Sequence, residues 1–133
     1  MRTLIRYTEH MIAYNLKGTG AVMLTDEVRD YLNNKLEKIE KLVDPNDTAV
    51  RADVELATTG GARTGELFRA EINLSISGAF FRAEASEGTL HAAIDEAVDE
   101  LRRELQKKIG KKRDLGRRAA QKVKDLYRYW KGS

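Results

Sequence analysis

The sequence predicts an α/β (α+β) two-layer sandwich in the order β-α-β-β-β-α, with a four-stranded mixed sheet and two helices on one face. Two segments place apolar residues at three- and four-residue steps, and four others alternate apolar and polar residues. Because each helix and the sheet have one apolar face, the economical arrangement packs both helices on that face of the sheet. The chain of 133 residues, of which 41% are hydrophobic and 34% charged, can bury one such core.

The first strand and the first helix follow a short N-terminal extension. Residues 11–17 alternate and predict a strand that the glycines at 18 and 20 end. Thr25 can cap the helix through its hydroxyl, and the acidic residues after it suit the positive end of the helix dipole. The helix is expected to run to about Val43, where Asp44-Pro45 stops it. Its core face consists of Val28, Leu32, Leu36, Ile39 and Val43.

Two longer alternating segments, residues 50–56 and 68–76, predict an antiparallel pair with one buried face and one wet face. Their connection at 59–65 is rich in glycine and is expected to be mobile. Ser77-Gly78 turns the chain into a fourth strand, where Phe81 faces inward and Arg82 outward. A right-handed crossover through the first helix makes the first two strands parallel.

Thr89 caps the second predicted helix, and Gly110 marks a predicted break in it. The apolar stripe of this helix consists of Leu90, Ile94, Ala97, Val98, Leu101, Leu105 and Ile109. Beyond it, the chain keeps a narrow helical rhythm that Gly116 interrupts, so this tail is expected to be helical only when bound. The predicted domains are therefore an N-terminal extension at 1–10, a core domain at 11–112 and a basic C-terminal tail at 113–133.

Charge is sorted along the chain. Residues 1–100 carry 11 Lys and Arg against 18 Asp and Glu, whereas residues 101–133 carry 13 against 3. Such a basic block is typical of proteins that bind polyanions, because phosphates exchange condensed counterions for Lys and Arg. The alternative is a solvated helix end whose cations interact favourably with the helix dipole.

The residues of enzyme chemistry are sparse. The chain has no Cys, and its two histidines, His10 and His91, lack metal-ligand spacing. The acidic residues of the second helix are explained by a solvated face, and the glycine pairs do not match a phosphate-binding loop. No apolar run approaches the length of a membrane span. We therefore predict a cytosolic protein that is not an enzyme, with no cofactor, no metal and no small-molecule substrate.

Two stretches resemble the ribosome hibernation factors, the hibernation-promoting factor / ribosome-associated inhibitor family, also called the S30AE or sigma-54 modulation family. The first stretch is Thr25-Asp26-Glu27-Val28-Arg29-Asp30-Tyr31-Leu32, with the lysines that follow it. The second contains Leu90-His91-Ala92-Ala93-Ile94-Asp95 and the basic run Leu101-Arg102-Arg103-Glu104-Leu105-Gln106-Lys107-Lys108. His91 departs from the family's usual tyrosine, and Thr89 from its common Asp cap.

The resemblance implies binding to the small ribosomal subunit and its 16S-type rRNA in the channel for mRNA and tRNA. Occupying that channel would inhibit translation by steric exclusion under stress or in stationary phase. The family's long form carries a further C-terminal dimerisation domain, for which 113–133 is too short and too basic. The resemblance thus implies a short form, cytoplasmic and monomeric when free.

The candidate RNA-binding residues are cations on the two helices and one on the last strand. Arg103 and Lys107 are four positions apart and share a helix face, which Lys111 continues. Lys35 lies at the edge of the core stripe of the first helix, where its stem can cover apolar surface. The predicted set is Arg29, Lys35, Lys38, Lys41, Arg82, Arg102, Arg103, Lys107, Lys108, Lys111, Lys112 and Arg113.

Two other functions remain open from the residues. The predicted sandwich is dsRBD-like, so the chain could be a general double-stranded-RNA-binding protein or RNA chaperone that is not specific to the ribosome. Such a domain needs charges that span two minor grooves, and the 60–65 loop offers only Arg63. A third candidate is an interaction protein whose acidic face docks a protein partner.

Overall fold

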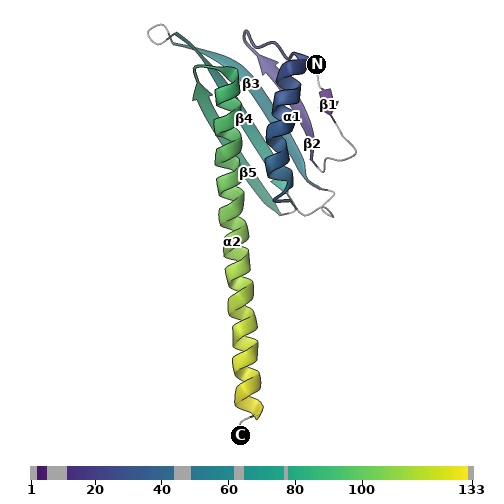
Figure 1. The fold of residues 1–133 in the computed structure, drawn as a ribbon, viewed down its shortest axis with the longest axis vertical. Coiled ribbons are helices and arrows are strands. Elements are labelled where there is room, and N and C mark those ends of the chain that lie inside the picture. The colour runs from purple at the N-terminus through teal and green to yellow at the C-terminus, as the bar shows by residue number, and fades with distance from the viewer. Residues whose placement is uncertain (1–2, 6–11, 44–48, 62–64, 77, 132–133) are drawn as a thin grey trace.

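A computed structural model describes residues 3–5, 12–43, 49–61, 65–76 and 78–131. Side chains at 3–5, 61, 65–66, 111–116, 127 and 129–131 lie outside this description. The elements, in chain order, are β1 (Thr3–Ile5), β2 (Ala13–Thr19), α1 (Asp26–Glu40), β3 (Arg51–Gly61), β4 (Gly65–Ile76), β5 (Ala79–Glu87) and α2 (Leu90–Lys131). Both helices cover the same face of the sheet (Figure 1).

The sheet confirms the predicted mixed topology. Its strand order is β1-β2-β3-β4-β5. β2 and β3 are parallel, with Tyr14 opposite Ala52, and every other pair is antiparallel. The parallel pair follows from the crossover through α1, because a strand–helix–strand connection returns the chain in its original direction. The structure adds β1, a strand of three residues that the alternation pattern does not predict.

The core lies between the sheet and the two helices, as the sequence pattern predicts. Tyr14, Val54 and Ile72 are buried on three neighbouring strands, and Leu32 and Leu101 cover them from the two helices. Every predicted core position of the first helix is buried. On α2 the buried positions of the predicted stripe are Ile94, Ala97, Val98, Leu101 and Leu105. No polar or charged residue in the described chain is buried. Apolar burial therefore provides the stability of this layer.

The predicted caps are present. The amide of Val28 donates to the Thr25 hydroxyl at 3.2 Å, and the amide of Ala92 donates to the Thr89 hydroxyl at 3.1 Å. Each bond satisfies one of the amides that a helix start leaves without a partner. α1 ends at Glu40, three residues before the predicted end, although Val43 is still buried.

Several predicted strand ends are wrong, because backbone pairing continues past the alternating residues. β2 runs through Gly18 and ends before Gly20, whose φ of 68° is left-handed. A side chain at Gly20 would also collide with the Thr58 hydroxyl, which accepts a hydrogen bond from the Ala21 amide. β3 and β4 pair as far as Gly61 and Gly65, so most of the predicted mobile connection is strand. Residues 62–64 of that connection lie outside the described residues.

The predicted break at Gly110 is also wrong. α2 is one continuous helix of 42 residues, and it runs well past the end of the sheet (Figure 1). Leu105 is the last buried residue among the side chains that the structure describes on this helix. We call residues 110–131 the helical extension; at 1.5 Å per residue it is about 32 Å long. The helix also crosses the position after residue 112 at which the sequence predicts a domain boundary. That boundary stays a prediction.

Replacing Ile94 or Leu101 by Ala should lower the free energy of unfolding by about 2–5 kcal/mol, because each would leave a cavity between helix and sheet. These side chains are 1% and 0% exposed. Urea denaturation measures the loss. Glu96→Ala, at an exposed position of the same helix, should change stability by less than about 0.5 kcal/mol. Equal effects at both kinds of site would contradict the packing of α2 on the sheet.

Gly110→Ala should increase the helix content seen by far-UV circular dichroism. Gly is about 1 kcal/mol less favourable than Ala inside a helix, and a Cβ at Gly110 would meet no atom within 4 Å. A loss of helix content or of thermal stability in Gly110→Ala would mean that the backbone at Gly110 is not helical in solution. Gly78→Ala is the matched control: it also has open space but a φ of 74°, so it should destabilise the protein.

Candidate nucleic-acid interface

The contact between α1 and α2 fixes the arrangement of their cations. The Tyr31 hydroxyl donates to Oδ1 of Asp95 at 2.6 Å, and Lys35 Nζ lies 3.1 Å from the same oxygen. Nearer the helix N-termini, His91 Nε2 lies 2.6 Å from Glu27 Oε1, and its ring meets that of Tyr31 edge-on at 4.3 Å. Residue numbers rise together along this contact, so the helices are parallel and α1 ends beside the middle of α2 (Figure 1).

Asp95 is the centre of this contact. Partial burial raises the pKa of Asp95, but the hydrogen bond from Tyr31 and the ammonium of Lys35 outweigh it, so that this pKa lies below its ordinary value. The hydrogen bond to Asp95 raises the pKa of Tyr31, and the bond with the same carboxylate raises the pKa of Lys35. Lys35 is 26% exposed and also lies over the Tyr31 ring. It therefore acts as a structural partner of Asp95.

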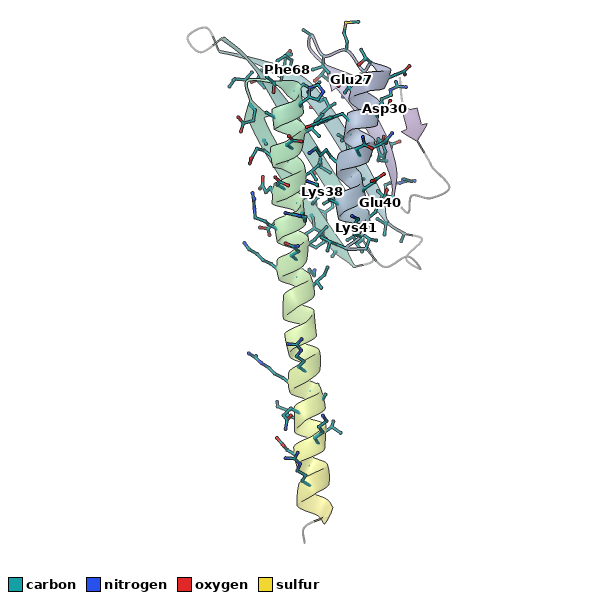
Figure 2. All side chains as sticks on the ribbon, viewed as in Figure 1. Glu27, Asp30, Lys38, Glu40, Lys41 and Phe68 are labelled. Carbon is teal, nitrogen blue, oxygen red and sulfur yellow. The ribbon has the colours of Figure 1, made fainter. Side chains whose placement is uncertain are left out.

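Lys38 and Arg102 lie two helical turns beyond this contact. Lys38 is seven positions after Tyr31, and Arg102 is seven positions after Asp95, so each stays on the flank that faces the other helix. Figure 2 shows Lys38 between the two helices. Among the described residues neither cation forms an ion pair, and Nε of Arg102 is buried without a hydrogen-bond partner. Two like charges brought together in this way favour an anion from outside the chain.

More cations lie near this level on the two helices. Lys41 caps the C-terminus of α1 (Figure 2). Lys107 Nζ is 3.5 Å from Glu104, and Lys108 Nζ is 5.5 Å from the centroid of the Phe81 ring, both on exposed side chains of α2. We call the whole group the helix-end surface; it consists of Lys38, Lys41, Arg102, Arg103, Lys107 and Lys108.

The structure does not bring Arg29 and Arg82 into this surface. Arg29 is nine positions before Lys38 on α1, which places it half a turn around the helix, away from α2. Arg82 lies on the face of the sheet opposite the helices, 3.1 Å from Glu71 and 3.4 Å from Glu84. Outward alternation in a strand points away from the helices, so Arg82 lies apart from the helical cations. Its contact with RNA stays a prediction.

The open face of the sheet holds a network of paired charges. Arg69 lies 2.8 Å from Glu55, 3.0 Å from Glu71 and 3.1 Å from Glu84. The hydrogen bond to Glu84 raises the pKa of Arg69, and the bond from Asn73, opposed by burial, lowers the pKa of Glu71. A shallow groove of about 340 Å³ crosses this network between β2 and β4. Its two glutamates, Glu55 and Glu71, already have basic partners within the sheet, and Asp53 accepts a hydrogen bond from the amide of Asn15.

Lys111, Lys112 and Arg113 complete the predicted set, and their backbone belongs to the helical extension. Their side chains lie outside the described residues, so their role stays a prediction. Five further cations, which the sequence prediction missed, follow on the same helix and are exposed: Arg117, Arg118, Lys122, Lys124 and Arg128. Their spacing can be read from the sequence. Because the second helix was expected to break at Gly110, this spacing did not indicate a shared helix face.

Other site chemistry is not found in the described part of the chain. No group of three or more His, Asp or Glu residues there could hold a metal ion. None of the described helices combines the length and apolarity needed to cross a membrane. His91, predicted as a helical surface residue, is 44% exposed and bonded to Glu27. What the described residues offer is a basic surface for an anionic partner.

Comparison with known proteins finds a matching family model, a curated relative and solved structures with the same fold. The family model described as "Sigma 54 modulation protein / S30EA ribosomal protein" matches residues 15–113. A curated relative, the ribosome hibernation promotion factor of Picosynechococcus sp., is 31% identical over 74 residues. That match covers 56% of this chain and 37% of the relative, so the chain spans well under half of that protein's length.

Two solved structures share the fold. The crystal structure of the N-terminal domain of Protein Y from Thermus thermophilus is 32% identical, with a TM-score of 0.58, and the match covers 69% of this chain and 92% of that one. A ribosomal subunit interface protein from Coxiella burnetii is 15% identical with a TM-score of 0.58, covering 73% and 97%. At that low identity the second likeness concerns the fold alone.

Tyr31→Phe should raise the pKa of Asp95, which two-dimensional NMR titration of the carboxyl carbon measures. A carboxyl whose folded pKa is depressed stabilises the fold above its unfolded pKa, and this stabilisation is lost as pH falls through the folded pKa. The variant should therefore lose about 0.5–1.5 kcal/mol near neutral pH and depend less on pH in the acid range.

Tyr14→Phe is the matched control, because it removes a hydroxyl that donates to the amide oxygen of Asn33 and not to a carboxylate. It should leave the pKa of Asp95 unchanged. An Asp95 titration that is identical in the parent and in Tyr31→Phe would show that the contact between the helices differs in solution.

Proposed function

The chain belongs to the Sigma 54 modulation protein / S30EA ribosomal protein family, and from that premise we propose that it is a ribosome hibernation factor. In this proposal it binds the small ribosomal subunit and its 16S-type rRNA in the channel that mRNA and tRNA use. The bound protein excludes both ligands by its volume, so no catalytic group is needed. It acts in the cytoplasm under stress or in stationary phase and is monomeric when free.

The observation that carries this proposal is the helix-end surface. Parallel packing of α1 and α2 brings six cations from two helices to one region. Five of them form no ion pair with a described carboxylate, and Lys107 pairs only with Glu104, within its own turn. RNA phosphates are the natural partner of such a surface, because each Lys or Arg that contacts a phosphate releases condensed counterions. The helix dipole accounts for Lys38 and Lys41 at the C-terminus of α1, but not for the four α2 cations, which lie in the interior of a continuous helix.

The charges of the sheet also support binding of the ribosome through the helix layer. Its open face is a network in which Arg69 and Arg82 neutralise Glu55, Glu71 and Glu84. Such a face offers little uncompensated charge to RNA, and it offers no unpaired acidic patch there to a basic protein partner. Both points favour the helix layer as the side that faces rRNA, and they weigh against docking of a protein on an acidic face of this sheet.

General binding of double-stranded RNA is the alternative. The β3–β4 hairpin projects beyond the helices (Figure 1), as a loop that enters a second minor groove would need to do. Affinity for isolated RNA duplex compared with affinity for intact small subunits distinguishes the two functions. A ribosome factor should prefer the subunit by at least about a hundredfold at physiological salt, whereas a general binder should not.

The parent protein should co-sediment with small subunits and lower translation in a cell-free system at near-stoichiometric ratio. Arg103→Glu with Lys107→Glu should weaken this binding at least about tenfold, because two cations of the helix-end surface become repulsive to phosphate. The slope of log affinity against log salt should become less steep by about one unit for each lost contact. Thermal stability should change little, because both side chains are exposed.

The matched control is Lys17→Glu with Arg51→Glu, which makes the same charge change on β2 and β3, in the sheet layer. It should bind small subunits as the parent does. Equal loss in both double variants would rule out the helix-end surface as the specific contact. Undiminished translation with every small subunit occupied would rule out exclusion of mRNA and tRNA.

A further inference from the structure

The helical extension packs on nothing in the described chain. Every described side chain from 117 to 126 is exposed, as is Arg128, and the apolar residues Val123 and Leu126 are 66% and 61% exposed. A helix that buries no face gains little from tertiary packing, which supplies most of the stability of helices in proteins. The purpose of this segment therefore lies in contacts outside the chain.

Its charges and apolar residues lie on opposite sides of the helix. At 100° per residue, Arg117, Lys124 and Arg128 fall within about 40° of one another and form one row along about 17 Å. Ala119, Val123 and Leu126 form a narrow stripe on the opposite side. Arg118 and Lys122 lie on a flank between the two. We call the first group the cationic row and Arg118 with Lys122 the flank pair.

The cationic row is aligned with the helix-end surface. Arg103, Arg117 and Lys124 are separated by multiples of seven residues, so each lies within about 60° of the others around α2. The apolar stripe correspondingly continues the side of α2 that Leu105 buries against the sheet, at a level where the described sheet has ended. One continuous helix thus presents cations from both regions on its outward side.

The cations of the extension are uncompensated. Residues 110–131 carry nine Lys and Arg against two Asp. Of the described cations there, none forms an ion pair with another described residue, and Asp125 instead accepts a hydrogen bond from the Gln121 amide at 2.9 Å. By contrast, Arg69 and Lys35 in the body each bind a carboxylate within 3.1 Å. Charges left without partners on a helix repel one another and favour a polyanion.

We propose that the helical extension is a second RNA-binding site, in which the cationic row lies along the phosphate backbone of a structured RNA segment outside the region that the helix-end surface contacts. This inference rests on the proposed function for the choice of rRNA as the target. A line of regularly spaced phosphates matches a straight row of cations on a helix. Because α2 is continuous, the row keeps a fixed orientation relative to the body.

Two other occupants fit the charge and the stripe less well. A second copy of the chain would pair the stripes as a coiled coil, but the apolar positions of this stripe in the sequence, from Leu115 to Trp130, span only about two heptads, where three to four are typical. It would also bring together two segments with the same strong positive charge. A membrane surface needs a broader apolar face than Ala119, Val123 and Leu126 provide.

Matched double variants test the proposal. Arg117→Gln with Lys124→Gln removes two charges of the cationic row, and Arg118→Gln with Lys122→Gln removes one Arg and one Lys from the flank pair. Gln has nearly the helix propensity of Lys and Arg, so both variants should keep the helix, as far-UV circular dichroism would show. Each full-length protein is titrated against small ribosomal subunits and against a 20-base-pair RNA duplex.

The row variant should bind small subunits about tenfold more weakly than the parent, with a salt slope less steep by about one unit for each lost contact. The flank variant should change affinity less than threefold. Equal losses of affinity in the two variants would overturn specific contact through the cationic row. Parental affinity in both variants would overturn RNA binding by the helical extension.

The RNA duplex separates this proposal from the proposed function. A parent that fails to bind small subunits, but binds duplex in a manner that depends on Arg117 and Lys124, would overturn ribosome hibernation and support the extension. A parent that binds subunits through Arg103 and Lys107, with no effect of the cationic row on binding to subunits or to duplex, would support ribosome hibernation. It would overturn RNA binding by the helical extension. Concentration-dependent dimerisation that Leu126→Gln abolishes would overturn the proposal in favour of a second copy.

Discussion

Burial of one apolar sheet face beneath two parallel helices is the constraint on which the rest of this molecule depends. The crossover from β2 through α1 to β3 sets the direction of the first helix, and the turn after β5 sets the direction of the second. With Leu32 and Leu101 both fully buried over the sheet, neither helix can rotate to present other residues. The positions of the surface cations are therefore a consequence of core packing.

The same constraint separates structural charges from available ones. On the open face and between the helices, carboxylates and cations pair within the protein, as Arg69 does with three glutamates and Lys35 with Asp95. Beyond the Tyr31–Asp95 contact, lysines and arginines become more frequent on both helices, although Glu40 and Glu104 remain among them. A count of charges along the sequence cannot make this distinction, because pairing depends on which strands and flanks are adjacent.

Periodicity in the sequence was sufficient for the order of elements from β2 to α2, the Thr25 and Thr89 caps, most of the buried stripes and the parallel pair β2–β3, but not for β1. The ends of elements were less predictable, since backbone pairing carries β3 and β4 into their glycines. Gly110 costs a helix about 1 kcal/mol, which the strong helix formers around it offset, so the tail stays helical. Of the candidate site, the sequence placed Lys38 and Lys41 at the end of the first helix, whereas Arg82 could be placed only once the covered face of the sheet was known. Binding of RNA by these residues stays a prediction.

The length of α2 also has a consequence for the approach to any charged partner. The acidic excess lies in residues 1–100 and the basic excess in residues 101–133, and the continuous helix carries part of the latter about 32 Å from the body. Charges of opposite sign held so far apart by a rigid rod make a large permanent electric dipole. In the field of a polyanion such a molecule rotates before it arrives, basic end leading. Encounter is thereby oriented and accelerated at low ionic strength, and this advantage fades once the Debye length falls below the length of the rod.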